Sequence, residues 1–361
     1  MNRILSIALA TAFAVGSLPA AEVADGIELK GDIRYRHEMI DKEGSTTRTR
    51  HRVRARVELK AEVNDTLKAA VRVASGSSDP VSSNQTLDDS FSSKGINLDK
   101  AYLDWAPEQL GGVHIIGGKM GKPWICVADL VWDGDLNPEG LAAKVSAGED
   151  VTVTASAGGF WVDERSSTSS DAMLYAGQVA LGVKGPVGLT IGAGVYTFTE
   201  LEGNTVLADE TDSFGNSAVE VLDAMGAVES LEYANEFEEV EGFIEAKTKA
   251  GELPIKAYAQ YVVNNDASAD DTGYLFGVGL GKAKEPGQVE FGYNYRDLEK
   301  DAVLGAMTDS DSFGGGTDGK GHKLMGKLKI AKNFDLGATY FMQEAGTKDY
   351  DRLQIDLKLK F

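Results

Sequence analysis

The chain has 361 residues, a formal net charge of −20 at pH 7 and a single cysteine, Cys126. The negative charge argues against nucleic acid as a partner, and one cysteine cannot form an internal disulfide. The mean hydropathy of −0.20 and the lack of an 18-residue apolar run after the N-terminus argue against a bundle of membrane-spanning helices. They do not argue against membrane-spanning strands, in which apolar and polar residues alternate.

Residues 1–21 have the pattern of a secretory signal peptide. Arg3 supplies a positive charge, an apolar run extends from Ile4 to Val15, and small residues at Ala20 and Ala21 suit a cleavage site. The alternative, a helical membrane anchor, would need a longer apolar stretch. We expect residues 1–21 to be removed on export and residues 22–361 to form one domain.

The segment from Arg48 to Val63 alternates strictly between charged residues and mostly apolar ones. As a β-strand it has one charged face and one mostly apolar face, whereas a helix would scatter its arginines all round. At about sixteen residues it is long for a soluble strand but suits a tilted strand that crosses a membrane and projects beyond it. The charged face then requires water, and the apolar face requires lipid.

Sixteen alternating segments are separated by turn signals. The predicted strands are residues 27–39, 48–63, 66–74, 98–106, 112–119, 140–147, 150–157, 172–184, 187–200, 236–249, 254–264, 273–283, 287–298, 320–331, 334–343 and 351–361. Short turns tend to alternate with longer loops, and an even strand number places both termini on the short-turn side. These features predict an all-β fold, a transmembrane antiparallel β-barrel of about 16 strands with short periplasmic turns and long extracellular loops.

Three predicted loops are long: residues 75–97, 121–139 and 201–235. Within the third, Ser217 precedes Glu220 by three residues, which is the pattern of a capping box. Apolar residues follow at helical spacing, so we predict a short amphipathic helix that begins there.

Five arginines on alternate positions of the second strand are the candidate lumen-lining bases: Arg48, Arg50, Arg52, Arg54 and Arg56. An arginine that faced lipid would cost about 2–4 kcal/mol near the midplane, so we expect these side chains to face the lumen. The alternative to a role in permeation is that they pair with carboxylates of the first strand, such as Asp32 and Glu38.

Signals for catalysis are weak. The four histidines show no metal-ligand spacing, no serine lies in a nucleophile elbow, and Cys126 has no local partner that would activate it. We therefore predict neither an enzymatic reaction nor a cofactor.

Four blocks resemble recurring motifs of the putative porin family of Gram-negative bacteria, in that family's order: SGSSDPVSSNQTLDDSF, INLDKAYLDW, GGKMGKPW and LVWDGDLNPEGLA. The aromatic residue that ends the last strand, Phe361, resembles the assembly signal of outer-membrane barrels. The resemblance implies a water-filled channel in the bacterial outer membrane for passive diffusion of small hydrophilic solutes and ions. It also implies outer-membrane lipid and lipopolysaccharide as neighbours and, by analogy, a homotrimer.

The resemblance further implies that the loop of residues 121–139 folds into the barrel and narrows it. Its candidate constriction acids are Asp129, Asp133, Asp135 and Glu139. Acids opposite a basic wall would create a transverse field that orients polar solutes and sets ion preference. The alternative is that these acids are solvated surface charges.

Weak calcium binding by acidic loops is a further possibility that the sequence leaves open. Asp133, Asp135 and Asn137 have the spacing that begins a calcium loop, but Pro138 and Lys144 stand where glycine and glutamate are expected. Residues 200–241 contain thirteen acids and no lysine or arginine, which suits either cation bridging or a solvated face. An alternative function is therefore a structural or adhesive barrel whose loops bind calcium, lipopolysaccharide or a cell surface.

Overall fold

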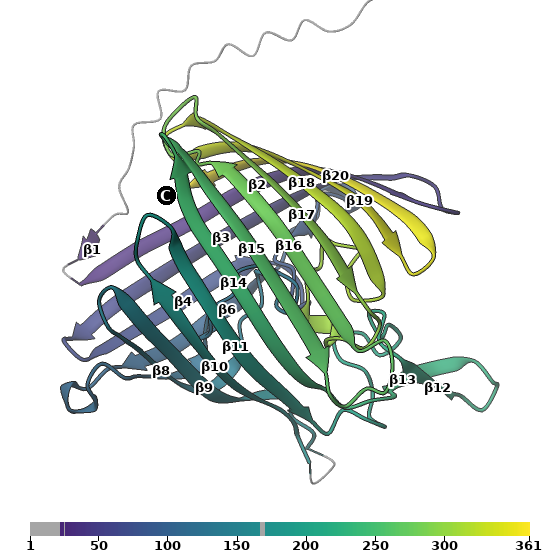
Figure 1. The fold of residues 1–361 in the computed structure, drawn as a ribbon. Helices are drawn as coiled ribbons and strands as arrows, with labels where there is room; N and C mark the ends of the chain where they lie inside the picture. The colour runs from purple at the N-terminus through teal and green to yellow at the C-terminus, as the bar shows by residue number, and fades with distance from the viewer. Residues whose placement is uncertain (1–21, 25, 167–169) are drawn as a thin grey trace, which may run out of the picture.

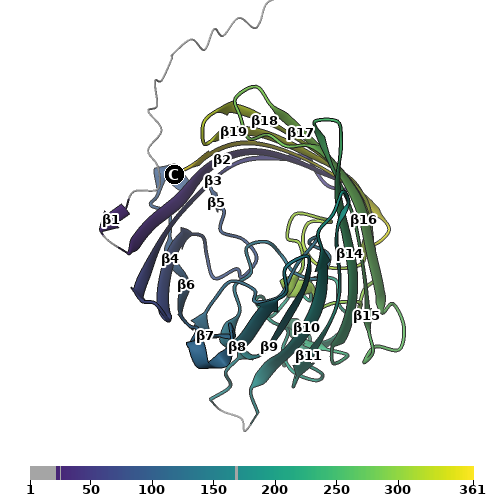
Figure 2. The same ribbon diagram turned by 60° about the vertical axis from the view of Figure 1, so that its left-hand side comes forward.

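The computed structural model describes residues 22–24, 26–166 and 170–361, so the predicted signal peptide lies outside the described residues. The chain forms a closed barrel of long antiparallel strands that surround an interior space (Figures 1 and 2). The last strand pairs with the first long strand, which closes the sheet and leaves neither with a free edge. No helix in the described part of the chain is long and apolar enough to cross a membrane.

The sixteen barrel strands all coincide with predicted segments, so this prediction is confirmed. They are β2 (Ile27–Lys42), β3 (Arg48–Asn64), β4 (Leu67–Ser75), β6 (Ile96–Trp105), β7 (His114–Lys119), β8 (Glu139–Ala147), β9 (Val151–Asp163), β10 (Ala172–Val183), β11 (Gly188–Thr199), β14 (Glu238–Ala250), β15 (Leu253–Asn264), β16 (Thr272–Gly281), β17 (Val289–Leu298), β18 (Gly319–Ala331), β19 (Phe334–Ala345) and β20 (Lys348–Lys360). Two short strands, β1 (Glu22–Ala24) and β5 (Gln85–Thr86), pair with β2 and β3 respectively.

Residue parity decides which side chains face the lumen. On β3, Val57 and Leu59 are 39% and 40% exposed on the outer surface, whereas Arg54 is only 4% exposed inside. On β20, Leu357 is likewise exposed and Arg352 is buried. Because successive strand side chains point to opposite faces, this alternation gives an apolar outer surface and a polar lumen wall.

Strand β9 continues to Asp163, six residues beyond its predicted end. The residues just beyond the predicted end are Gly158 and Gly159, and glycine in a strand interior has no side chain to pack. In the structure, a Cβ on Gly158 would lie 2.8 Å from the carbonyl oxygen of Leu141, so glycine permits close strand contact here. Phe160, which follows, is buried inside the barrel.

The predicted helix that begins at Ser217 is wrong. Residues of that loop form a two-stranded hairpin instead, β12 (Ala218–Leu222) and β13 (Val228–Tyr233), which lies at the edge of the barrel (Figure 1). Valines alternate with other residues in β12, and Gly226 adopts a positive φ of 83° in the connecting turn. The capping-box pattern at Ser217 was misleading. The backbone amide of Ser217 donates to the Asp301 carboxylate at 2.8 Å, and the residues that follow it form a strand.

The connections differ between the two ends of the barrel. Most turns at the end that carries the termini are short, and the longest loops emerge at the opposite end, although the β19–β20 connection there has only residues 346–347. Two of the long loops, residues 120–138 and residues 299–318, contain many buried side chains and lie inside the ring of strands (Figure 2). We call them the β7–β8 loop and the β17–β18 loop.

Candidate pore constriction

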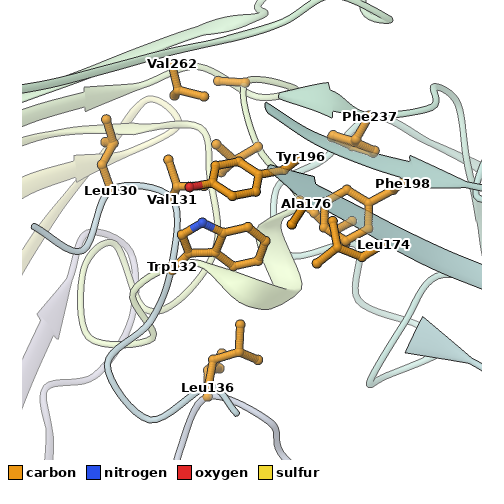
Figure 3. Close-up of a cluster of buried hydrophobic side chains, with 14 of the residues drawn as sticks. Leu130, Val131, Trp132, Leu136, Leu174, Ala176, Tyr196, Phe198, Phe237 and Val262 are labelled. Carbon is orange, nitrogen blue, oxygen red and sulfur yellow. The ribbon is translucent and has the colours of Figure 1, made fainter. Parts of the chain in front are cut away.

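The β7–β8 loop is attached to the lumen wall by an apolar cluster. Its Leu130, Val131 and Trp132 are almost fully buried, and the Trp132 ring contacts the Tyr196 ring edge-on at a centroid distance of 4.9 Å (Figure 3). Phe198 on β11 packs on the same cluster. Since aromatic side chains bury large areas, this contact fixes the loop against one side of the barrel.

The β17–β18 loop packs directly on the β7–β8 loop. The Thr308 hydroxyl donates to the Leu130 carbonyl oxygen at 2.7 Å, and the Ser310 amide donates to the Asp133 carboxylate at 2.9 Å. The Asp133 amide in turn donates to the carbonyl oxygen of Met307 at 2.9 Å. The two loops therefore form one unit inside the barrel, which the sequence pattern did not predict.

The opposite lumen wall, formed by β20, β2 and β3, is rich in arginine. Asp32 accepts hydrogen bonds from Arg54 and Arg56, each at 2.8 Å. Glu38 pairs with Arg50 and Arg352. We call the inward-facing side chains of these three strands the basic wall.

Two loop carboxylates connect the inner loops to the basic wall. Asp135 of the β7–β8 loop lies 3.0 Å from Arg56 and 3.6 Å from Arg54. Asp311 of the β17–β18 loop lies 2.7 Å from Arg352 and 3.1 Å from Arg36.

A second cluster of charges lies nearer to β17 and β18. Asp129 accepts from Arg296 and, at 2.9 Å, from Lys323. Asp309 of the β17–β18 loop contacts the same two cations at 3.2 and 3.4 Å. Two carboxylates and two cations are thus balanced within this cluster.

The structure brings together some of the predicted site residues and separates others. Arg50, Arg52, Arg54 and Arg56 lie on the lumen face of β3, with Arg48 exposed at its extracellular end. Asp129, Asp133 and Asp135 lie in the inner loop unit, as described above. Glu139 is instead the first residue of β8, on the parity of the outward-facing Leu141, and it forms an ion pair with Lys119 at 2.6 Å.

The loop acids have different pKa directions. Burial raises the pKa of Asp133 well above its ordinary value, and the nearby Asp309 carboxylate raises it further. For Asp135, burial also acts to raise the pKa, but Arg54 and Arg56 outweigh it and the pKa is lowered. The same balance lowers the pKa of Asp311, where Arg352 and Arg36 outweigh burial.

The residues with calcium-loop spacing do not converge on one point. Asp133 accepts from backbone amides, Asp135 contacts arginines, and the Asn137 amide donates to Asp99 at 2.9 Å. Within residues 22–24, 26–166 and 170–361, no group of three or more histidine, cysteine, aspartate or glutamate side chains could hold a metal ion. Calcium binding by the acidic loops stays an untested prediction.

Two cavities lie on either side of the contact between the loops and the basic wall. The periplasmic cavity has a volume of about 1200 Å³ and is bounded by β14 to β20, including Lys358 and Lys360. The extracellular cavity has a volume of about 460 Å³ and includes Arg48, Arg52 and Arg352. The contacts of Asp135 and Asp311 with the basic wall lie between the residues that line these two cavities.

A closed sixteen-stranded barrel with an apolar outside, a charged lumen and inward-folded loops defines the class of outer-membrane porins. The chain belongs to the family described as "Putative porin", whose sequence profile matches residues 32–225 and 227–361. It is a channel of the bacterial outer membrane for small solutes. Among curated proteins, none is similar enough in sequence to count as a relative.

Several solved barrels share the fold at low sequence identity. OprB of Pseudomonas putida has 11% identity and a TM-score of 0.61, with 93% of this chain and 94% of that chain covered. OmpF of Salmonella typhi, solved in complex with daunomycin, has 12% identity and a TM-score of 0.53, with 93% and 98% covered. OmpT of Vibrio cholerae, in a trimer form, has 14% identity and a TM-score of 0.52, with 93% and 100% covered.

Proposed function

We propose that solutes diffuse along the basic wall, past a constriction formed by the β7–β8 and β17–β18 loops. The observation that supports this path is the position of Asp135 and Asp311, which contact the basic wall between the two cavities. The apolar cluster around Trp132 occupies the other side of the lumen, so water and polar solutes are expected to avoid that side.

The proposed constriction consists of the inner-loop acids Asp129, Asp133 and Asp135 together with the β3 arginines that face them. We leave Glu139 out of the proposed constriction, because its side chain is on the outward-facing side of β8, where it pairs with Lys119. No catalysed reaction is proposed.

Two aspects of assembly belong to the proposal. The apolar outer face of the strands is expected to contact outer-membrane lipid, with lipopolysaccharide around the extracellular loops. A homotrimer is proposed by analogy with the trimer form of Vibrio cholerae OmpT, which shares the fold.

Swelling of liposomes that contain the purified protein tests the proposed path. A diffusion channel should admit small neutral sugars, and the swelling rate should fall steadily as the sugar becomes larger. Equal swelling for all sizes would argue against a narrow constriction, and no swelling with any sugar would contradict the channel. Protein-free liposomes are the control.

A further inference from the structure

We propose that the channel prefers small anions that carry a carboxylate or phosphate group, and that these move along a continuous track of cationic side chains on the basic wall. This inference rests on the proposed function, because it names the solute class of the same path. The register of β20, β2 and β3 places these cationic side chains next to one another, in a line that joins the two cavities.

The three strands of the basic wall place their inward-facing residues in five rows. In sequence from the periplasmic end, the rows across β20, β2 and β3 are Lys360–Asp32–Arg56, Lys358–Arg34–Arg54, Asp356–Arg36–Arg52, Gln354–Glu38–Arg50 and Arg352–Ile40–Arg48. Neighbouring strands lie about 4.8 Å apart and successive rows about 6.7 Å apart. An anion that leaves one row therefore reaches the next within about the length of an arginine side chain.

Cations outnumber acids on this wall. The five β3 arginines are joined by two arginines on β2 and by Arg352, Lys358 and Lys360 on β20, so ten cationic side chains occupy the five rows. The rows contain only three carboxylates. Asp135 and Asp311, which contact this wall, add two more from the loops, which still leaves a clear excess of positive charge along the wall.

One row consists only of cations: Lys358, Arg34 and Arg54 lie directly opposite one another. Like charges in adjacent strand positions are destabilising, so a wall that served only to hold loops would be more stable with acids interspersed here. Among the described residues, Lys358 forms no ion pair, and it lines the periplasmic cavity. This row is the point at which the track is most positive.

Arg52 also lacks a carboxylate partner among the described residues. Its guanidinium donates to two neutral acceptors, the Ser82 hydroxyl at 3.5 Å and the Asn84 carbonyl oxygen at 3.4 Å. It lines the extracellular cavity, where five cationic side chains accompany a single acid, Asp79. A guanidinium presents paired donors that match the geometry of a carboxylate or phosphate, so this cavity suits the first binding of such an anion.

The charged residues that line the periplasmic cavity also have a positive net charge. Eight lysines and four carboxylates line it, and some of the lysines, including Lys358, form no ion pair with any residue that the structure describes. A passage whose two ends and middle are all positive concentrates anions and repels cations. The net charge of −20 for the whole chain does not predict this preference, because many of the acids lie in residues 200–241, outside the track.

Reversal potentials across planar bilayers under a gradient of potassium chloride test the preference. The wild-type protein should be anion-selective, and the double variant Arg48→Glu with Arg52→Glu should lower the chloride-to-potassium permeability ratio by about tenfold, at the lower end of the effect of charged clefts on ion concentration. The milder Arg52→Gln variant covers the case in which the double variant does not fold, and it should shift the ratio in the same direction. Lys119→Gln removes a cation from the outward-facing parity and is the matched control.

Competition with oxyanions tests the solute class. Inorganic phosphate and acetate, added separately, should each reduce the chloride current of the wild-type protein and should reduce it less in the Arg52→Gln variant. Stepwise conductance without anion preference, or with no effect of either oxyanion, would overturn this inference and leave the channel intact. A complete lack of conductance would instead overturn the proposed function.

Discussion

Asp135 and Arg56 lie 3.0 Å apart and join the β7–β8 loop to the basic wall across the lumen. The same carboxylate accepts a hydrogen bond from the Ser83 hydroxyl at 2.8 Å, so a second extracellular loop is held at this point. A single carboxylate thus contacts the basic wall and two loops, and its removal should loosen the constriction without unfolding the barrel.

Asp135→Asn should make the open channel noisier and increase its anion preference. The substitution removes a negative charge that faces Arg54 and Arg56, and hydrogen bonds to charged groups contribute about 1.5–3 kcal/mol each. Single-channel recording measures both effects. Asp88→Asn is the control, because Asp88 pairs with Lys94 at an exposed site; an equal change in both variants would argue against a role for Asp135 in the constriction.

Trp132→Ala should destabilise the packing of the β7–β8 loop by about 3–5 kcal/mol, as for other large buried aromatic side chains. The substitution removes the contacts of this ring with the Trp124, Tyr196 and Phe198 rings. Protease sensitivity of the loop should rise, and the conductance should become larger or less steady. Trp161→Ala, on the outer surface of β9, is the matched control and should leave both unchanged.

Ile355→Arg should lower the free energy of unfolding in lipid vesicles by about 2–4 kcal/mol, because residue 355 lies midway along β20 and faces lipid. Thr339→Arg places the same charge beside the periplasmic cavity, on the β19 residue next to Ala338, which lies opposite Ile355, and should cost far less. Equal costs for the two variants in urea titrations would contradict the assignment of the two faces.

The contact between the inner loops should weaken as pH rises through the raised pKa of Asp133. Because that pKa is higher in the folded loop than in the unfolded chain, folding takes up a proton, and the resulting stability is present at low pH and lost at higher pH. The pH dependence that comes from Asp311 has the opposite sign. Because its pKa is lowered, its contacts persist until the solution is strongly acidic. Channel noise should therefore increase with pH, and Asp133→Asn should remove most of this dependence; unchanged dependence in that variant would exclude Asp133 as its source.

The sequence predicted the barrel well because parity is a strong signal. Residues such as Val57 and Arg54 meet lipid and water respectively, and each strand repeats that alternation. The β12–β13 hairpin was missed because its contacts with Asp301 lie far away in the sequence, whereas a capping-box pattern is purely local. Local patterns are least reliable where tertiary contacts determine the backbone.

The candidate site was predicted only in part. The β3 arginines could be recognised from their spacing, but Asp311, which pairs with Arg36 and Arg352 of the same wall, belongs to a loop with no pattern that would place it inside the barrel. Glu139 appeared to belong to the loop acids because it follows them closely, and only the pairing of β7 with β8 places it on the outer parity. Long-range pairing, which no single segment encodes, decides which charges meet.

Single-channel recording of the purified, folded protein in planar bilayers tests the central claim most directly, namely that a water-filled path runs through this barrel. We predict stepwise increases in current as individual channels insert, with a smaller conductance than in a variant that lacks the inner contacts of Asp135 and Asp311. A folded barrel that inserts into the bilayer and never conducts would contradict the account.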